Sequence, residues 1–117
     1  AKPLLSHVLD TAKTLAPASV SVVYGHGGEY LKNYYKNHEF QWVYQEAQLG
    51  TGHALNLVLP HLQDNQRVLV LYGDVPLLTA QTLDRLITTT PANALGLLVA
   101  NVVDPTGLGR IVRTSEG

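Results

Sequence analysis

Cysteine and methionine are both missing from this chain of 117 residues. Without cysteine the protein has no disulfide framework and no thiolate metal site, which is compatible with a reducing compartment, and we expect a cytoplasmic location. The lack of methionine has a second meaning, because translation starts with that residue. A helical pattern begins within the first five residues, and a hairpin pattern is interrupted at the last five. We therefore expect the chain to be an internal fragment.

Long apolar runs and concentrations of one charge are missing as well. No apolar run approaches the roughly 20 residues that cross a bilayer, and the first residues lack a signal-peptide pattern. Eight Lys and Arg residues are scattered among nine Asp and Glu residues, for a net charge of −1. Nucleic acids are held mainly by clustered cations, so neither a nucleic-acid nor a membrane partner is expected. What is present, 45% hydrophobic residues, suffices for one soluble core.

Strand and helix patterns alternate along the chain. Apolar residues at helical spacing predict a helix from Leu4 to just before Pro17, then helices over residues 30–35, residues 53–59 and from Thr79 onward. Apolar runs predict strands at residues 19–23, 40–44, 68–71, 94–103 and 110–112. The run Val68–Leu71 is apolar throughout, as in a strand buried on both faces, and is expected at the centre of the sheet. This order predicts the α/β class, with one open, mostly parallel, doubly wound sheet in a single domain.

In such sheets ligands bind beyond the carboxyl ends of the strands, which makes the loops at residues 24–28, 45–52 and 72–76 the candidates. The first loop, Gly25-His26-Gly27-Gly28, resembles half of a dinucleotide fingerprint. The last glycine of that fingerprint would fall at Tyr30, which is too bulky for close packing of helix on strand. A tight turn with positive φ angles is the favoured interpretation.

The second loop places Gly50 and Gly52 at the start of a predicted helix. Free backbone N–H groups and missing side chains there allow a base, ribose or phosphate to approach closely. A flexible loop with Thr51 as the helix N-cap is an equal alternative. Gln45 adds a side-chain amide that both donates and accepts, as the recognition of a pyrimidine edge requires.

Asp74 in the third loop directly follows the buried strand and a glycine. That position suits a carboxylate ligand for Mg²⁺ beside phosphates, and the alternative is a turn residue ahead of Val75-Pro76. The chain has no cysteine and no serine in a nucleophile elbow, so we assign no catalytic nucleophile. The five histidines show no metal-ligand spacing with an acidic partner, and we expect them to be surface or packing residues; they are His7, His26, His38, His53 and His61.

Four motifs, in this order and spacing, resemble the uridylyltransferase domain of the bacterial GlmU family. The motifs are Val23-Tyr24-Gly25-His26-Gly27-Gly28, Gln45-Glu46-Ala47-Gln48-Leu49-Gly50-Thr51-Gly52-His53-Ala54, Leu71-Tyr72-Gly73-Asp74-Val75-Pro76-Leu77 and Asp104-Pro105-Thr106-Gly107-Leu108-Gly109-Arg110-Ile111-Val112. The resemblance covers nearly the whole chain. It implies that residues 1–117 are the central part of one Rossmann-like nucleotidyltransferase (pyrophosphorylase) domain, and that the sheet is incomplete.

The resemblance also implies an activity and a set of site residues. Members of the family transfer a uridylyl group from UTP to N-acetylglucosamine 1-phosphate with Mg²⁺. The products are pyrophosphate and UDP-N-acetylglucosamine, a precursor of peptidoglycan and lipopolysaccharide. By resemblance, Gln45, Gly50 and Thr51 contact the uridine, Tyr72 and Gly73 line the nucleotide-sugar site, Asp74 ligates Mg²⁺ beside the substrate, and Gly109 lies against the sugar.

Other family features have no counterpart in the chain. The glycine-rich basic loop that holds the phosphates is expected before Ala1, and the second protein ligand of the metal after Gly117. The acetyltransferase domain, through which the parent is expected to form a homotrimer, is also absent, and Leu108 stands where many relatives carry an aromatic residue. Two alternatives therefore stay open. The chain is a non-catalytic nucleotide-binding or assembly module, or the parent is a nucleotidyltransferase for another sugar phosphate or base.

Overall fold

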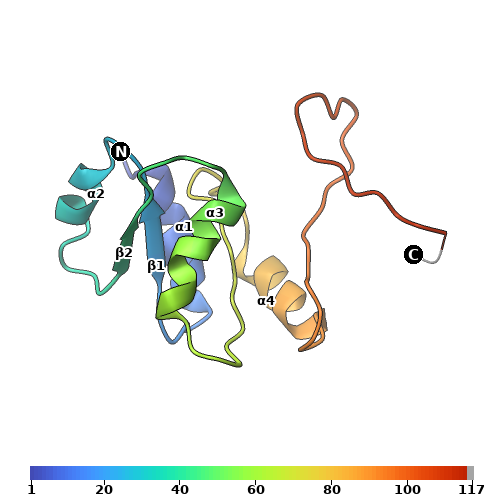
Figure 1. Cartoon of the computed structure of the whole chain (residues 1–117), viewed down its shortest axis with the longest axis horizontal. Helices are drawn as coiled ribbons and strands as arrows, with labels where there is room; N and C mark the ends of the chain where they lie inside the picture. Colours follow the sequence, from blue (N-terminus) through green and yellow to red (C-terminus); the bar gives the residue numbers. More distant parts are fainter. Residues whose placement is uncertain (116–117) are drawn as a thin grey trace.

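The computed structural model describes residues 1–115 and has the alternating order that the sequence predicts (Figure 1). The elements are α1 (Leu4–Thr14), β1 (Ser21–Tyr24), α2 (Glu29–Tyr34), β2 (Gln41–Tyr44), α3 (Thr51–Val58), the 3-10 turn η1 (Leu59–His61) and α4 (Ala80–Thr89). The two strands pair in parallel. The α/β class, the two strands before residue 45 and all four predicted helices are confirmed. No helix within residues 1–115 combines the length and apolarity needed to span a membrane.

The helices begin and end where local chemistry favours it. Thr79 caps α4, since its Oγ1 accepts a hydrogen bond from the Thr82 backbone N–H at 3.2 Å. Leu83, which is 1% exposed, anchors the same helix to the body. α3 gives way to η1 one residue before Pro60, whose ring cannot continue an α-helical hydrogen-bond pattern.

The sheet is covered on both faces. Val22 lies opposite Trp42 in the register and Val23 lies opposite Val43, so successive pairs face opposite sides. On one side Val22 packs in a buried cluster with Leu9 of α1. α3 packs against β1, and Figure 1 shows it on the side opposite to α1. Helices on both faces of a parallel sheet give the doubly wound arrangement expected from the sequence.

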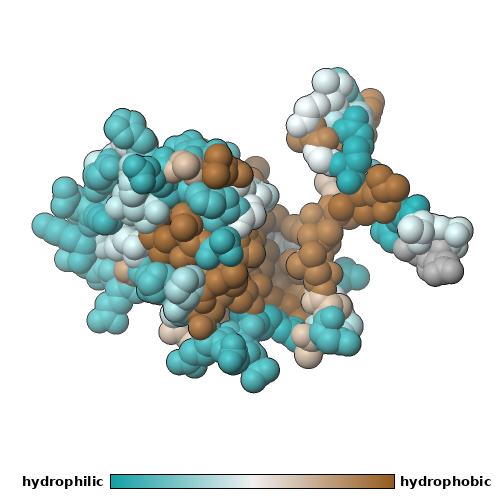
Figure 2. Space-filling view, in the orientation of Figure 1, coloured by the Kyte–Doolittle hydropathy of each residue, from teal (hydrophilic) through white to brown (hydrophobic). Residues whose placement is uncertain are grey.

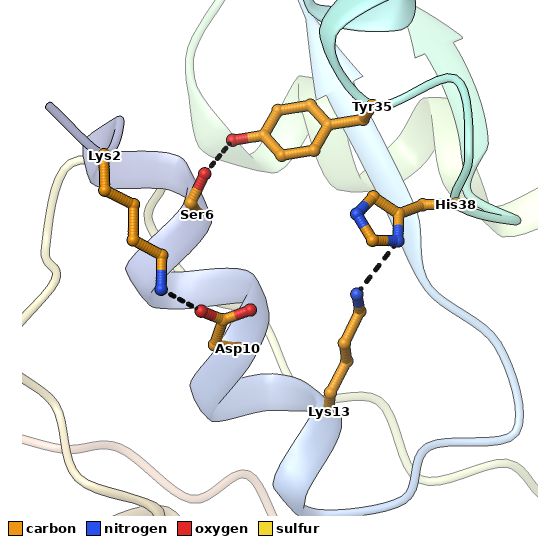
Figure 3. Close-up of polar contacts among 6 residues, drawn as sticks. All are labelled: Lys2, Ser6, Asp10, Lys13, Tyr35 and His38. Carbon is orange, nitrogen blue, oxygen red and sulfur yellow. Dashed lines mark hydrogen bonds and ion pairs between the residues drawn. The ribbon is translucent and has the colours of Figure 1, made fainter.

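A set of polar contacts fastens α1 to the segment that follows α2 (Figure 3). The hydroxyl groups of Ser6 and Tyr35 form a buried hydrogen bond of 2.6 Å. Near the other end of the helix, Lys13 Nζ lies 3.1 Å from His38 Nδ1. Tyr35 is also a member of the buried cluster, so this phenol joins the apolar core and the polar contacts at one point.

The prediction that Val68–Leu71 forms the centre of the sheet is wrong. These residues are not in a strand, and the sheet of residues 1–115 consists of β1 and β2 alone. A cavity of about 780 Å³ is lined both by residues 20–23 and by Val68–Leu71. Strands must lie about 4.8 Å apart for their backbones to pair. The edge of β1 and the apolar run therefore have no ladder between them.

The predicted strands at residues 94–103 and 110–112 are also wrong. Residues 94–115 form an arm that leads away from the body of the molecule (Figure 1). Its apolar side chains are exposed, with Leu95 at 84% and Val112 at 86% of full exposure, and Figure 2 shows this apolar surface along the arm. High β propensity does not make a strand without a paired backbone, and no strand within residues 1–115 pairs with this arm.

We expect Tyr35→Phe to lower the free energy of unfolding by about 1 kcal/mol, because Ser6 would be left buried without its partner. Tyr34→Phe is the matched control. Its hydroxyl belongs to a side chain that is 58% exposed and makes no hydrogen bond in the described part of the chain, so the change should stay within about 0.5 kcal/mol. Urea unfolding followed by circular dichroism measures both. Equal effects of the two variants would contradict a stabilising role for the Ser6–Tyr35 hydrogen bond.

Candidate functional site

Four of the seven predicted site residues line one cavity. β1 and β2 are parallel, so their carboxyl ends meet at one edge of the sheet. The cavity of about 780 Å³ beside β1 extends to the loops at this edge, where Gln45 and Thr51 line it together with Tyr72 and Gly73. The structure thus brings together two loops that are more than 20 residues apart in the sequence.

A hydrogen-bond network organises the first of these loops. The Gln45 backbone N–H donates to the Tyr24 carbonyl at 2.8 Å, which continues the pairing of the strands into the loop. The side-chain Nε2 of Gln45 donates to the carbonyl oxygen of Gly50 at 3.2 Å and to His53 Nδ1 at 3.0 Å. His53, expected from the sequence to be a surface or packing residue, thus contacts a predicted site residue. The sequence feature that could have indicated this contact is the position of His53 in the first turn of the helix that follows Gln45.

Gly50 has a conformation that favours glycine, with φ of +97° and ψ of −179°. It is the N-cap of α3, and Thr51 is the first helical residue. The alternative with Thr51 as N-cap is therefore wrong. The backbone N–H groups of the first turn of α3 have no acceptor within the helix. They can therefore donate to an anion or a carbonyl group that approaches the loop.

The glycine-rich loop after β1 is a tight turn, as favoured from the sequence. Gly28 N–H donates to the Gly25 carbonyl at 3.0 Å, and Gly27 has a φ of +79°. A Cβ atom on Gly25 would lie 2.3 Å from Nε2 of Gln48, so this glycine allows the loop to approach the loop after β2. The glycines of the first loop thus shape the neighbouring candidate site.

Asp74 lies in a turn at the same edge of the sheet. The Val75 N–H donates to the Tyr72 carbonyl at 3.3 Å, which makes Gly73 and Asp74 the central turn residues, and Asp74 is exposed. No group of three or more His, Asp or Glu side chains in residues 1–115 could hold a metal ion. A single carboxylate still fits Mg²⁺, which typically takes one or two protein carboxylates and completes its shell with phosphates and water.

Gly109 is not brought to the cavity. It lies in a self-contained loop of the arm, where Asp104 Oδ1 accepts hydrogen bonds from the Thr106 hydroxyl at 2.6 Å and the Thr106 N–H at 3.0 Å. These bonds hold the pKa of the Asp104 carboxyl below its usual value. Arg110 closes the loop by donating to the Pro105 carbonyl at 2.6 Å. The role of Gly109 at a sugar stays a prediction.

The cavity has little charge of its own. Within residues 1–115, Arg67 is the only charged residue that lines it, and its guanidinium donates to the Ile87 carbonyl. A ligand at this edge would therefore meet amide, hydroxyl and backbone groups rather than free cations. This composition suits a base and a ribose better than a triphosphate.

A comparison with protein families gives the class. The family model described as "MobA-like NTP transferase domain" matches residues 1–107, and the chain belongs to this family. Nucleotidyl transfer is accordingly the activity that the family supports, and its nucleotide chemistry agrees with a cavity at the carboxyl edge of a parallel sheet.

Individual relatives narrow the class further. The chain is 50% identical over 115 residues to the bifunctional protein GlmU of Idiomarina loihiensis and 53% identical over 116 residues to that of Halorhodospira halophila. GlmU of Herminiimonas arsenicoxydans is 49% identical over 112 residues. These alignments cover 98%, 99% and 96% of this chain, and it spans about a quarter of each relative (25%, 24% and 25%). The resemblance to GlmU inferred from the four motifs is confirmed.

We expect Gly50→Ala to destabilise the protein by about 1–3 kcal/mol, because an alanine must adopt a backbone conformation reserved for glycine. Gly52→Ala is the matched control two residues later. Gly52 lies within α3 with open space around its Cβ position, so alanine should be neutral or slightly stabilising there. Urea unfolding of both variants checks the pair. Similar stabilities for the two alanine variants would contradict the conformation given for Gly50.

Proposed function

We propose that the chain carries the uridine-binding part of an enzyme that transfers a uridylyl group from UTP to N-acetylglucosamine 1-phosphate. The products are UDP-N-acetylglucosamine and pyrophosphate, and the reaction supplies cell-envelope precursors in the cytoplasm. Membership of the nucleotidyltransferase family and the similarity to GlmU support the reaction class. UTP, the sugar phosphate and Mg²⁺ are proposed as its particular substrates and metal.

One observation carries the proposal most directly: the amide of Gln45 is fixed beside the start of α3, and Gln45 lines the cavity. The fixed amide supplies a hydrogen-bonding group for a base edge. The free N–H groups of the first turn of α3 supply donors beside it. Glycine at position 50 leaves the space above this turn without a side chain. Together these groups suit a flat, polar ring such as a pyrimidine.

The chemistry needs positioning rather than a protein nucleophile. The phosphate oxygen of the sugar phosphate attacks the α-phosphorus of UTP in line, a P–O bond forms, and the bond to the pyrophosphate leaving group breaks. The Gln45 loop would hold the uridine, and Tyr72 with Gly73 would line the path of the nucleotide sugar. Mg²⁺, when bound, would neutralise charge on the phosphates, with Asp74 as one of its ligands.

A second function is favoured by the lack of free positive charge in the cavity. Arg67, the only charged residue lining it among residues 1–115, is already bound to a backbone carbonyl. Triphosphates need cations or a metal, so the 117-residue chain by itself would bind a nucleotide without transferring it. Calorimetry with UTP and a pyrophosphate-release assay on this chain separate the two functions. Turnover by the chain alone would exclude the purely binding one.

We expect Asp74→Ala to lower kcat/KM for pyrophosphate formation by at least about 100-fold in the full-length gene product, because a metal ligand stabilises charge by several kcal/mol in the transition state. Release of pyrophosphate from UTP and N-acetylglucosamine 1-phosphate, measured across a Mg²⁺ titration, is the assay. Asp84→Ala is the control, an exposed carboxylate on α4, and should keep its activity within about twofold. Full activity in the Asp74 variant would take this residue out of the mechanism.

A further inference from the structure

The side-chain amide of Gln45 has both of its N–H groups engaged within the chain. Nε2 donates to the Gly50 carbonyl oxygen and to His53 Nδ1, at 3.2 and 3.0 Å. A primary amide offers two N–H donors on its nitrogen and one carbonyl oxygen as acceptor. With both donors used inside the chain, Oε1 is the polar atom of this side chain that is left for a ligand.

The Gly50 carbonyl is the first of two acceptors that orient the amide of Gln45. A carbonyl oxygen accepts hydrogen bonds and cannot donate them, so the nitrogen of the amide must lie against it. The same oxygen accepts the Ala54 N–H at 3.1 Å, the first hydrogen bond of α3, which ties its position to the helix. A flipped amide would bring two acceptor oxygens face to face. The helix start thus supplies one of the two contacts that orient Gln45.

His53 supplies the second acceptor. Because an N–H of Gln45 is directed at Nδ1, this ring nitrogen carries the lone pair and the proton of the neutral ring is on Nε2. The ring is half-buried on the first turn of α3 and is held in place by the helix. Without this acceptor, the second N–H of Gln45 would lose its partner, and the amide would be freer to turn away or flip.

We propose that His53 is a positioning residue, which holds Gln45 with its oxygen outward and so makes the loop select uracil over cytosine. This inference rests on the proposed function. Uracil presents an N3–H donor next to the O4 acceptor, whereas cytosine presents a bare N3 next to an amino group. An outward amide oxygen beside the free N–H groups of α3 complements uracil. A flipped amide offers its nitrogen to N3 and so favours cytosine.

The test compares kcat/KM for UTP and for CTP in the full-length gene product. His53→Phe keeps a ring but removes the acceptor, and the ratio of the two values should fall about tenfold, mainly through a higher KM for UTP. His53→Asn is the conservative variant, because its Oδ1 can accept the hydrogen bond in place of Nδ1. The ratio should then stay within about threefold of the wild-type value.

Parallel losses on UTP and CTP in His53→Phe would show a merely structural role and overturn the proposal, as would an Asn variant that behaves like the Phe variant. ¹⁵N NMR of the imidazole is a readout that needs no nucleotide, with the Nε2–H tautomer expected at neutral His53. The Nδ1–H tautomer would contradict the contact itself. A wild-type protein that uses UTP and CTP equally would instead overturn the proposed base, and with it the selectivity assigned to His53.

Discussion

The parallel pairing of β1 with β2 is the constraint on which the rest of the structure depends. It sets the register that buries Val22 against Leu9 of α1 and leaves the opposite face for α3. It also sends both strand ends to one edge, where the Gln45 N–H continues the pairing by one more hydrogen bond to Tyr24. The loop after β2 therefore starts from a fixed point. A candidate site made of glycines and amides gains its geometry from this anchored start.

The local elements could be predicted from the sequence because their signals are local. Apolar spacing in α1, the Thr79 cap of α4 and Pro60 after α3 each act within a few residues. The prediction of a strand at Val68–Leu71 was wrong because a strand needs a paired neighbour. Instead of pairing with β1, this segment lines a cavity together with it. The strands predicted at residues 94–103 and 110–112 were wrong for the same reason. Side-chain composition alone does not say whether a backbone partner lies within hydrogen-bonding distance.

The sequence predicted which loops form the candidate site, but it did not predict the contacts between their side chains. Placing ligand-binding loops at the carboxyl edge follows from strand order, and Gln45, Thr51, Tyr72 and Gly73 do share one cavity. The role of His53 could not be derived from spacing, because a histidine on a first helical turn is usually exposed or packed. Only the distance from Nδ1 to the Gln45 amide shows its connection to the site. The position of Gly109 relative to the cavity depends on the path of the arm. The hydrogen bonds within its own loop do not determine that path.

The central claim is that the edge formed by the Gln45 loop and the Tyr72–Gly73 turn binds the uridine of a nucleotide. A ¹H–¹⁵N NMR titration of the protein with UTP tests it most directly, because it reports on each amide separately. The account predicts the largest shift changes at the Gln45 side-chain amide and at the backbone amides of Gly50, Thr51 and Gly73. Saturable shifts confined to residues around the Lys13–His38 contact, or no shifts at millimolar UTP, would contradict it.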